Sequence, residues 1–337
     1  MSRNWYEAVT PLLFEMISIV PRSANRVTTL ATIPRLACHV RIAQFVLCAP
    51  NTEHEETGFE QMHVALSLRD FKRIRELILL FVHEWVPDQL VPLRREHTEL
   101  RRAVLSQVFF DLQPDEFSAL QFLTLRTDAD SFVRCMQEFD GAIAAKARVD
   151  PLGASQQSVL RRWSALKTLD LCLVLEDEHA RVFFDYQTLG HYLVRIVGGC
   201  AQTLTTLSMC FSASPHARLR RFDHISAPFL DRITLPRLEA LFLEDFRMAP
   251  VELSDFVVEH LGPKSSLQLV HVAGVLMPPP PEVVHNLDLG GWAQFCRDLS
   301  PYAVKPAVQL EAIGYEKRAP LRPLDLEWIQ RTITNGV

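Results

Sequence analysis

Aliphatic residues recur along the chain in a repeated short pattern, L-x-x-L-x-L, in which Val or Met replaces Leu in places. Five copies begin at Leu120, Leu166, Leu204, Leu238 and Leu267. The later positions of each copy alternate with mostly polar residues, which is typical of a strand that buries one face. A polar segment or a helical apolar spacing follows several copies. Because parallel strands need a crossover connection, the pattern predicts strands joined by returning segments and lying parallel.

The intervals between the copies identify the class of repeat. They are 46, 38, 34 and 29 residues, the differences between positions 120, 166, 204, 238 and 267. Leucine-rich repeats recur at roughly 20–29 residues, so this array would carry insertions. We therefore predict an α/β fold, an irregular leucine-rich-repeat-like solenoid with parallel strands on one face and helices on the other. This domain would span residues 21–337, and the proline, glycine and serines of 148–158 mark a candidate subdivision.

Other segments give weaker predictions. Residues 40–47 are apolar enough for a strand, whereas Phe71, Ile74, Ile78, Phe81 and Trp85 keep the three- and four-residue steps of an amphipathic helix. The remaining expected elements are a helix near 100–109, one through 132–143, one near 189–197 ended by Gly198-Gly199, a short helix at 289–299, a strand at 310–313 and a closing helix at 324–333.

Composition narrows the functional classes. The chain has 337 residues, 48% of them hydrophobic and 22% charged, which is typical of a folded protein. Its net charge of −5 excludes a chain-wide basic field for nucleic acid, although Arg94-Arg95, Arg101-Arg102 and 217–221 are local basic clusters that we interpret as solvated. The longest unbroken apolar run is 77–82, too short to span a membrane.

The cysteines indicate a reducing compartment. There are seven, an odd number, and no pair has C-x-x-C spacing. This usage favours reduced thiols in a cytoplasmic or nuclear protein. Glu7 and Glu15 interrupt the N-terminal apolar residues, so no signal peptide is expected.

No catalytic, cofactor-binding or metal-binding motif stands out. Phosphate-binding glycine loops, H-E-x-x-H and G-x-S-x-G are absent from the sequence. Ser164 and Lys167 match S-x-x-K, but both flank a predicted strand, so we expect their side chains to diverge. The run 176–179 (Glu-Asp-Glu-His) is more typical of a solvated loop than of a metal site. We also expect Cys200 and Cys210 to be buried structural thiols and His191 to have a packing or surface role.

The positions between the buried leucines form the candidate binding face. Side chains alternate along a strand, so these residues face away from the core, and in a curved array they line a broad surface. The candidate partner-binding residues are Thr124, Arg126, Thr168, Asp170, Thr206, Ser208, Phe242, Glu244 and His271. Phe242 and Arg126 are the candidate anchors, because aromatic and arginine side chains dominate interface energetics.

The N-terminal residues resemble a known family. NWYEAVTPLLFEMISI (4–19) is similar to the end of the F-box in fungal F-box proteins, PRLACHVR (34–41) is similar to the linker that follows it, and segments including LPRLEALFLEDFRM (235–248) resemble their leucine-rich repeats. The resemblance implies that 1–20 are a remnant of the last F-box helix, from Arg3 to about Ile17, with Trp5, Tyr6, Val9, Leu12 and Leu13 as its residues. The Leu-Pro-x-Glu type start of a complete F-box is not in the sequence, which a truncated gene model or a diverged member would explain.

Three functions follow as hypotheses. The first is a non-enzymatic protein-interaction module, resembling the substrate-receptor part of an F-box subunit of a cullin-RING ubiquitin ligase. Its partners would be a protein substrate and, if an F-box lies upstream, the cullin ligase linker subunit, with no nucleic acid, membrane or cofactor. The second is a stand-alone protein-binding scaffold, and the third is a hydrolase that uses Ser164.

Overall fold

The computed structural model divides the chain into two compact units, Met1–Leu166 (unit 1) and Lys167–Val337 (unit 2). Each unit is described by itself. The structure describes residues 9–20, 24–47, 71–81, 101, 104–105, 118–149, 165–174, 186–211, 233–244, 255–256, 266–273, 276–277, 307–311 and 314–315.

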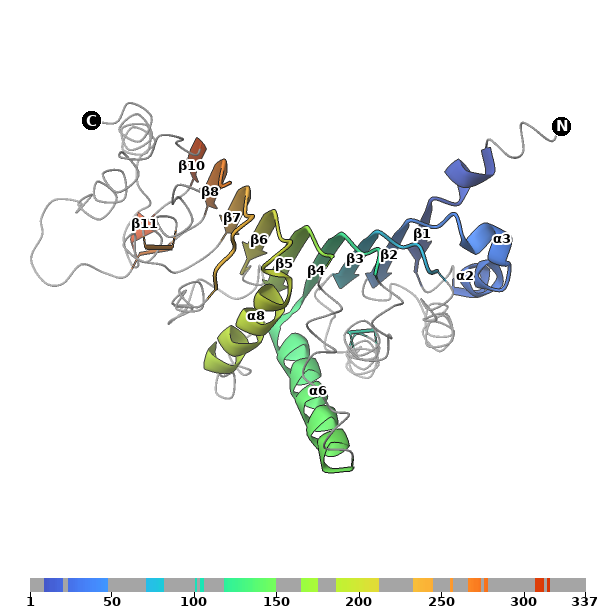
Figure 1. The fold of residues 1–337 in the computed structure, drawn as a ribbon, viewed down its shortest axis with the longest axis horizontal. Helices are drawn as coiled ribbons and strands as arrows, with labels where there is room; N and C mark the ends of the chain where they lie inside the picture. The colour runs from blue at the N-terminus through green and yellow to red at the C-terminus, as the bar shows by residue number, and fades with distance from the viewer. Residues whose placement is uncertain are drawn as a thin grey trace, which may run out of the picture. The chain divides into compact units, whose positions relative to one another are not determined.

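Unit 1 contains four parallel strands in chain order (Figure 1). They are β1 (Met16–Ile19), β2 (Ile42–Leu47), β3 (Glu76–Phe81) and β4 (Phe122–Asp128). Three helices of this unit are described: α2 (Ala24–Ala31), α3 (Pro34–Ala37) and α6 (Ala129–Val149). Helix α2 lies against α3 and β1, and α6 begins directly after the last residue of β4.

Unit 2 repeats the arrangement with five parallel strands, again in chain order (Figure 1). They are β5 (Thr168–Val174), β6 (Thr206–Cys210), β7 (Ala240–Glu244), β8 (Leu269–Ala273) and β10 (Ala307–Glu311). Helix α8 (Tyr186–Cys200) lies between β5 and β6 in the sequence. A separate parallel pair is formed by β9 (Leu276–Met277) and β11 (Gly314–Tyr315). Parallel strands alternating with helices confirm the predicted α/β class.

The buried aliphatic residues of successive strands lie beside one another. In unit 1 the row is Ile17–Ala43–Leu77–Leu123, and in unit 2 it is Leu169–Leu207–Leu241–Val270. All of these side chains are buried, and a second buried row lies two residues further along each strand. Within each unit, successive strands therefore contribute aliphatic residues to one core, and burial of their apolar area stabilises the fold.

The strands start in a common hydrogen-bonding pattern. In unit 1, the Arg41 carbonyl accepts the N–H groups of Arg75 and Glu76 at 2.7 and 3.1 Å. In unit 2, the Thr205 carbonyl accepts those of Glu239 and Ala240 at 2.7 and 3.0 Å. The same two-donor arrangement occurs at the carbonyls of Glu15, Arg75, Lys167 and Glu239. Strands β2, β3, β4, β6, β7 and β8 are thus fixed to the preceding strand at their first residue, and the backbone N–H groups there have partners.

Helix α8 packs through a single stripe. Its buried residues recur at three- and four-residue steps, the spacing of one helical face: Leu189, Tyr192, Leu193, Ile196, Val197 and Cys200. The helix continues through Gly198 and Gly199 to Cys200, so the prediction that these glycines end it is wrong. An added Cβ at Gly198 would meet nothing within 4 Å, so the position lies in open space.

The structure corrects the prediction for residues 71–85. Glu76–Phe81 form strand β3, whose buried residues are Leu77, Leu79 and Phe81, preceded by buried Ile74. Residues 77–81 are all apolar, so both helical steps of three or four and strand steps of two can be found in this short window. Pairing with β2 and β4 on both sides decides in favour of the strand.

The N-terminal helix is also shorter than predicted. Residues 9–13 are helical, but Met16–Ile19 pair with β2 as strand β1, so the expectation of a helix reaching Ile17 is wrong. The predicted strand at 40–47 is confirmed by β2, and that at 310–313 is confirmed in part by β10. The predicted helices at 289–299 and 324–333 lie outside the described residues. The boundary between the units, after Leu166, lies beyond the candidate subdivision at 148–158.

Candidate functional site

Each strand presents one buried and one accessible face. We call the accessible positions the open face. In unit 1 they are Met16, Ser18, Ile42, Gln44, Val46, Glu76, Ile78, Leu80, Phe122, Thr124 and Arg126. In unit 2 they are Thr168, Asp170, Cys172, Thr206, Ser208, Cys210, Ala240, Phe242, Glu244, Leu269, His271, Ala273 and Gln309. These side chains are half-buried or exposed, whereas their neighbours on the other face are fully buried, so this side of the strands is accessible to a partner.

The predicted partner-binding residues all lie on the open face. Thr124 and Arg126 belong to unit 1, and Arg126 is exposed. The other seven belong to unit 2, where the pairing of strands arranges them in rows. One row runs Asp170–Ser208–Phe242–His271–Gln309, and Thr168 lies beside Thr206 in another. Glu244 is exposed at the end of β7. All nine residues thus lie on the accessible side of their strands, and their role in binding stays a prediction.

The middle of the unit 2 row is held together by side-chain contacts. The rings of Phe242 and His271 are 5.9 Å apart between centroids and are tilted by 38°. On the other side, His271 Nδ1 lies 3.1 Å from Oε1 of Gln309, within hydrogen-bond distance. An aromatic side chain, an imidazole and an amide thus lie on three adjacent strands. This arrangement offers a partner one apolar surface beside groups that donate and accept hydrogen bonds.

The open face of unit 1 is more apolar than the sequence interpretation indicated. Met16 is 49% exposed and Phe122 is 40% exposed, and half-buried Ile42, Ile78 and Leu80 lie on the same face. Met16, Ile78 and Leu80 are missed because the sequence interpretation treats 71–85 as a helix and includes no strand at 16–19. Ile42 and Phe122 lie in predicted strands but are not among the predicted binding residues. The alternation of Leu77 and Leu79 with Ile78 and Leu80 is apolar on both faces, so it carries no polar marker of an accessible side.

The residues assigned to the F-box remnant are only partly described. Trp5 and Tyr6 lie outside the described residues. Val9 is half-buried, whereas Leu12 and Leu13 are 71% and 68% exposed. Leu12, Leu13 and Met16 are thus three exposed large apolar side chains within five residues at the start of unit 1.

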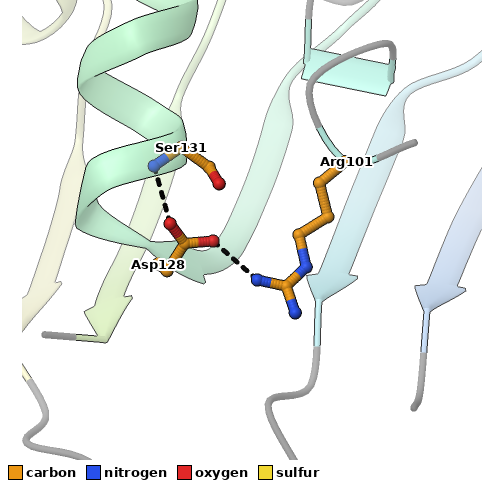
Figure 2. Close-up of polar contacts among 3 residues, drawn as sticks. All are labelled: Arg101, Asp128 and Ser131. Carbon is orange, nitrogen blue, oxygen red and sulfur yellow. Dashed lines mark hydrogen bonds and ion pairs between the residues drawn. The ribbon is translucent and has the colours of Figure 1, made fainter. Parts of the chain in front are cut away.

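A buried ion pair lies at the junction of β4 and α6 (Figure 2). Arg101 Nη1 donates a hydrogen bond to Asp128 Oδ2 at 2.6 Å, and the Ser131 N–H donates to Asp128 Oδ1 at 2.6 Å. Asp128 therefore caps the first turn of α6 and binds a guanidinium from a segment distant in sequence. Arg101 and Asp128 are 2% and 5% exposed. The interpretation of Arg101 as part of a solvated basic cluster is thus wrong.

The electrostatics of this pair are those of a structural anchor. Burial alone would raise the pKa of Asp128, but the Arg101 charge and the hydrogen bonds from Ser131 and Arg101 outweigh burial and lower that pKa. The carboxylate is consequently held ionised and fully engaged by its two partners. Nearby Thr127 is fully buried, and its Oγ1 has no hydrogen-bond partner among the described residues. We assign the pair to fixing the β4–α6 junction.

The remaining candidates for chemistry do not form a centre in the described part of the chain. Cys200 is buried, its thiol donates to the carbonyls of Ile196 and Val197, and burial raises its pKa to about 12. A thiol of this kind stays protonated and is a poor nucleophile. His191 is exposed beside Tyr192. Ser164 and 176–179 lie outside the described residues. Among the described His, Cys, Asp and Glu residues, no group of three or more could hold a metal ion.

Comparison with known proteins gives no family assignment. The chain matches no model of a known protein family and no curated protein. Within the described part of the chain, none of the helices combines the length and the apolar character needed to cross a membrane. The assignment of function therefore depends on the open face and on the residues that carry the family resemblance.

Proposed function

We propose that the chain is a non-enzymatic protein-binding module, a leucine-rich-repeat-like solenoid that holds a partner on the open face of its strands. The observation that carries the proposal is the row Asp170–Ser208–Phe242–His271–Gln309, in which five adjacent strands place polar and aromatic side chains side by side on an accessible surface. Repeat proteins use such extended surfaces for binding.

Phe242 is the proposed central anchor of this surface. Its ring is half-buried among its neighbours and contacts His271, so part of its surface is already ordered before a partner arrives. Hot spots of interfaces are typically aromatic or arginine side chains surrounded by groups of small individual effect. Arg126 on the open face of unit 1 is the corresponding cationic candidate.

We further propose that this module is the substrate-receptor part of an F-box subunit of a cullin-RING ubiquitin ligase. The support is the resemblance of residues 4–19 and 34–41 to F-box proteins, together with the exposed leucines Leu12 and Leu13. In this arrangement, the repeats bind a protein destined for ubiquitination and an F-box binds the linker subunit. A stand-alone scaffold would have the same open face without the second contact.

Affinity purification with paired variants tests the proposal. The bait is the full chain, expressed in its source cells, with wild type compared with the double variant Phe242→Ala/His271→Ala. The matched control is His191→Ala, which removes an exposed histidine from α8 in the same unit. We expect at least one protein whose recovery falls by about tenfold or more in the double variant and is unchanged in the control, because loss of a hot spot costs about 2 kcal/mol or more and about 1.4 kcal/mol is tenfold.

Two outcomes would contradict the proposal at different levels. If every recovered protein is retained equally by the double variant, and circular dichroism shows that both variants are folded, the open face of unit 2 is not the binding surface. If such a protein is found but the cullin linker subunit is never recovered with the product of the full gene, binding stands and the ligase assignment fails.

A further inference from the structure

Two thiols lie directly beside one another on the open face of unit 2. Strands β5 and β6 lie side by side (Figure 1), and Cys172 of β5 and Cys210 of β6 are paired in their register. Both are half-buried, so the expectation that Cys210 is buried is wrong, and neither is in a disulfide. Each follows a fully buried residue, Leu171 or Met209, so both side chains point to the same, accessible side of the strands. Nothing in the proposed binding function requires a pair of cysteines at these positions.

The backbone holds the two residues at a spacing that suits a disulfide. Neighbouring strands lie about 4.8 Å apart, and a disulfide is usual when the Cα atoms are about 4.4–6.8 Å apart and the Cβ atoms point the same way. The start of β6 is fixed to β5 by hydrogen bonds from the N–H groups of Thr205 and Thr206 to the Lys167 carbonyl, at 2.8 and 3.0 Å. The partner thiol is thus already in place, without a search by a mobile loop.

We propose that Cys172 and Cys210 form an oxidation-responsive dithiol whose co-reactant is a hydroperoxide such as hydrogen peroxide. One thiol, as its thiolate, attacks the peroxide oxygen; the O–O bond breaks, and a sulfenic acid and water form. The second thiol attacks the sulfenic sulfur, the S–O bond breaks, the S–S bond forms and a second water leaves. The two sulfurs lose two electrons and the peroxide is reduced to two waters. A thiol reductant reverses the step by exchange.

The other described cysteines differ in ways that make the pair selective. Cys135 and Cys200 are buried on helices α6 and α8. Cys38 is half-buried but lies directly after α3, outside the strands, so it has no cysteine beside it in the strand register. Reversible oxidation favours accessible thiols with a second thiol nearby to resolve the sulfenic acid. Among the described cysteines, only Cys172 and Cys210 are paired in the strand register.

Peptide mapping after mild oxidation tests the dithiol. The purified full chain is treated with hydrogen peroxide, blocked with an alkylating reagent, digested and analysed by mass spectrometry. We expect a peptide pair linked through Cys172 and Cys210, lighter than its reduced components by two hydrogens, which disappears after treatment with dithiothreitol. In Cys172→Ser and in Cys210→Ser, the remaining thiol should instead stop at the sulfenic acid, which dimedone traps. Cys200 should remain unmodified throughout.

The controls make each outcome decisive. Cys135→Ser serves as the matched control, because it removes a thiol from the same chain and should leave the Cys172–Cys210 link intact. Links from Cys172 or Cys210 to other cysteines, links between chains, or absence of oxidation in a folded chain would each overturn the proposal. Circular dichroism before oxidation establishes that each variant is folded. The experiment does not involve a binding partner, so its result is independent of the proposed function.

Discussion

The first open-face row of unit 1 carries Met16, Ile42, Glu76 and Phe122, three of them large and apolar, whereas the same row of unit 2 carries Thr168, Thr206, Ala240 and Leu269, of which only Leu269 is large and apolar. The buried positions next to them are aliphatic in both units. One backbone pattern therefore supports two surfaces of different chemistry, one richer in large apolar side chains and the other more polar with an aromatic centre. The comparison teaches that the buried residues determine where the strands form, whereas the residues that alternate with them determine the chemistry of the surface.

The edge where the strands start differs in charge. In unit 1 the residues whose carbonyls accept two N–H groups are Glu15, Arg41 and Arg75, with exposed Lys72 and Arg73 just before β3. In unit 2 the corresponding residues are Lys167, Thr205 and Glu239. Among these residues, unit 1 therefore has an excess of positive charge at this edge, whereas the charges of unit 2 balance.

The largest expected difference between the units comes from the buried ion pair, which only unit 1 contains among the described residues. Asp128→Ala leaves the Arg101 guanidinium buried without its carboxylate and removes the cap of α6. We expect a loss of about 3–5 kcal/mol in the free energy of unfolding, because breaking one partner of a buried pair is strongly destabilising. Urea unfolding followed by circular dichroism measures it. The double change Arg101→Met/Asp128→Leu is the control, and it should recover part of the loss.

The same pair gives a pH dependence with a defined sign. The folded state holds the Asp128 pKa below the value of about 3.9 that an unfolded aspartate has, so the stabilisation is fully present above that pH and is lost as the pH falls further through the folded pKa. Wild type should therefore lose more stability than Asp128→Asn between pH 6 and pH 3, as measured by urea unfolding. Equal losses would show that the carboxylate is not held by Arg101.

Truncating a core residue should lower the free energy of unfolding by a similar amount in each unit. Leu123 and Leu241 are fully buried at equivalent positions of β4 and β7. We expect Leu123→Ala and Leu241→Ala each to cost about 2–5 kcal/mol, from lost transfer free energy and the cavity that remains. Thermal unfolding monitored by calorimetry shows which transition moves. The adjacent open-face changes Thr124→Ala and Phe242→Ala are the controls, and a control that costs as much as the core change would contradict the assignment of faces.

The smallest effect on stability, and the clearest on surface chemistry, should come from Phe122. Its side chain is 40% exposed, so Phe122→Ser should change the free energy of unfolding by no more than about 0.5 kcal/mol. It should, however, lower binding of a hydrophobic fluorescent dye to the folded chain more than Phe242→Ser does, because Met16, Ile42 and Ile78 extend the apolar surface on the same face. If both variants bind the dye equally, the open face of unit 1 is not more apolar than that of unit 2.

The sequence predicts the leucine-rich strands well because each carries three aliphatic residues at a fixed spacing between polar ones. The first three strands depart from that pattern in composition. Ala43 occupies the core position of β2, and β3 is apolar on both faces, so helix and strand spacings could not be separated without the pairing of neighbours. Of these three strands, the sequence pattern indicates only β2. It does not indicate which strands pair with β2.

The accessible side of the unit 2 strands follows from the same spacing, since side chains alternate once a strand is placed. The Arg101–Asp128 pair was missed because its partners are 27 residues apart and nothing local distinguishes a buried arginine from the exposed one expected in an Arg-Arg pair. The Cys172–Cys210 pairing was missed because it requires the register between two strands. Long-range pairing, in both cases, is information that the tertiary fold supplies.

The carbonyl groups that accept two N–H groups at the start of each strand have a consequence for how this chain can change. Since β2, β3 and β4 are each set in place by a contact at their first residues, the length of the connection before them has no influence on the register. Core positions 17, 43, 77 and 123 are 26, 34 and 46 residues apart, yet they align. Neighbouring strands of unit 1 thus keep one register although the chain lengths that connect them differ by up to 20 residues.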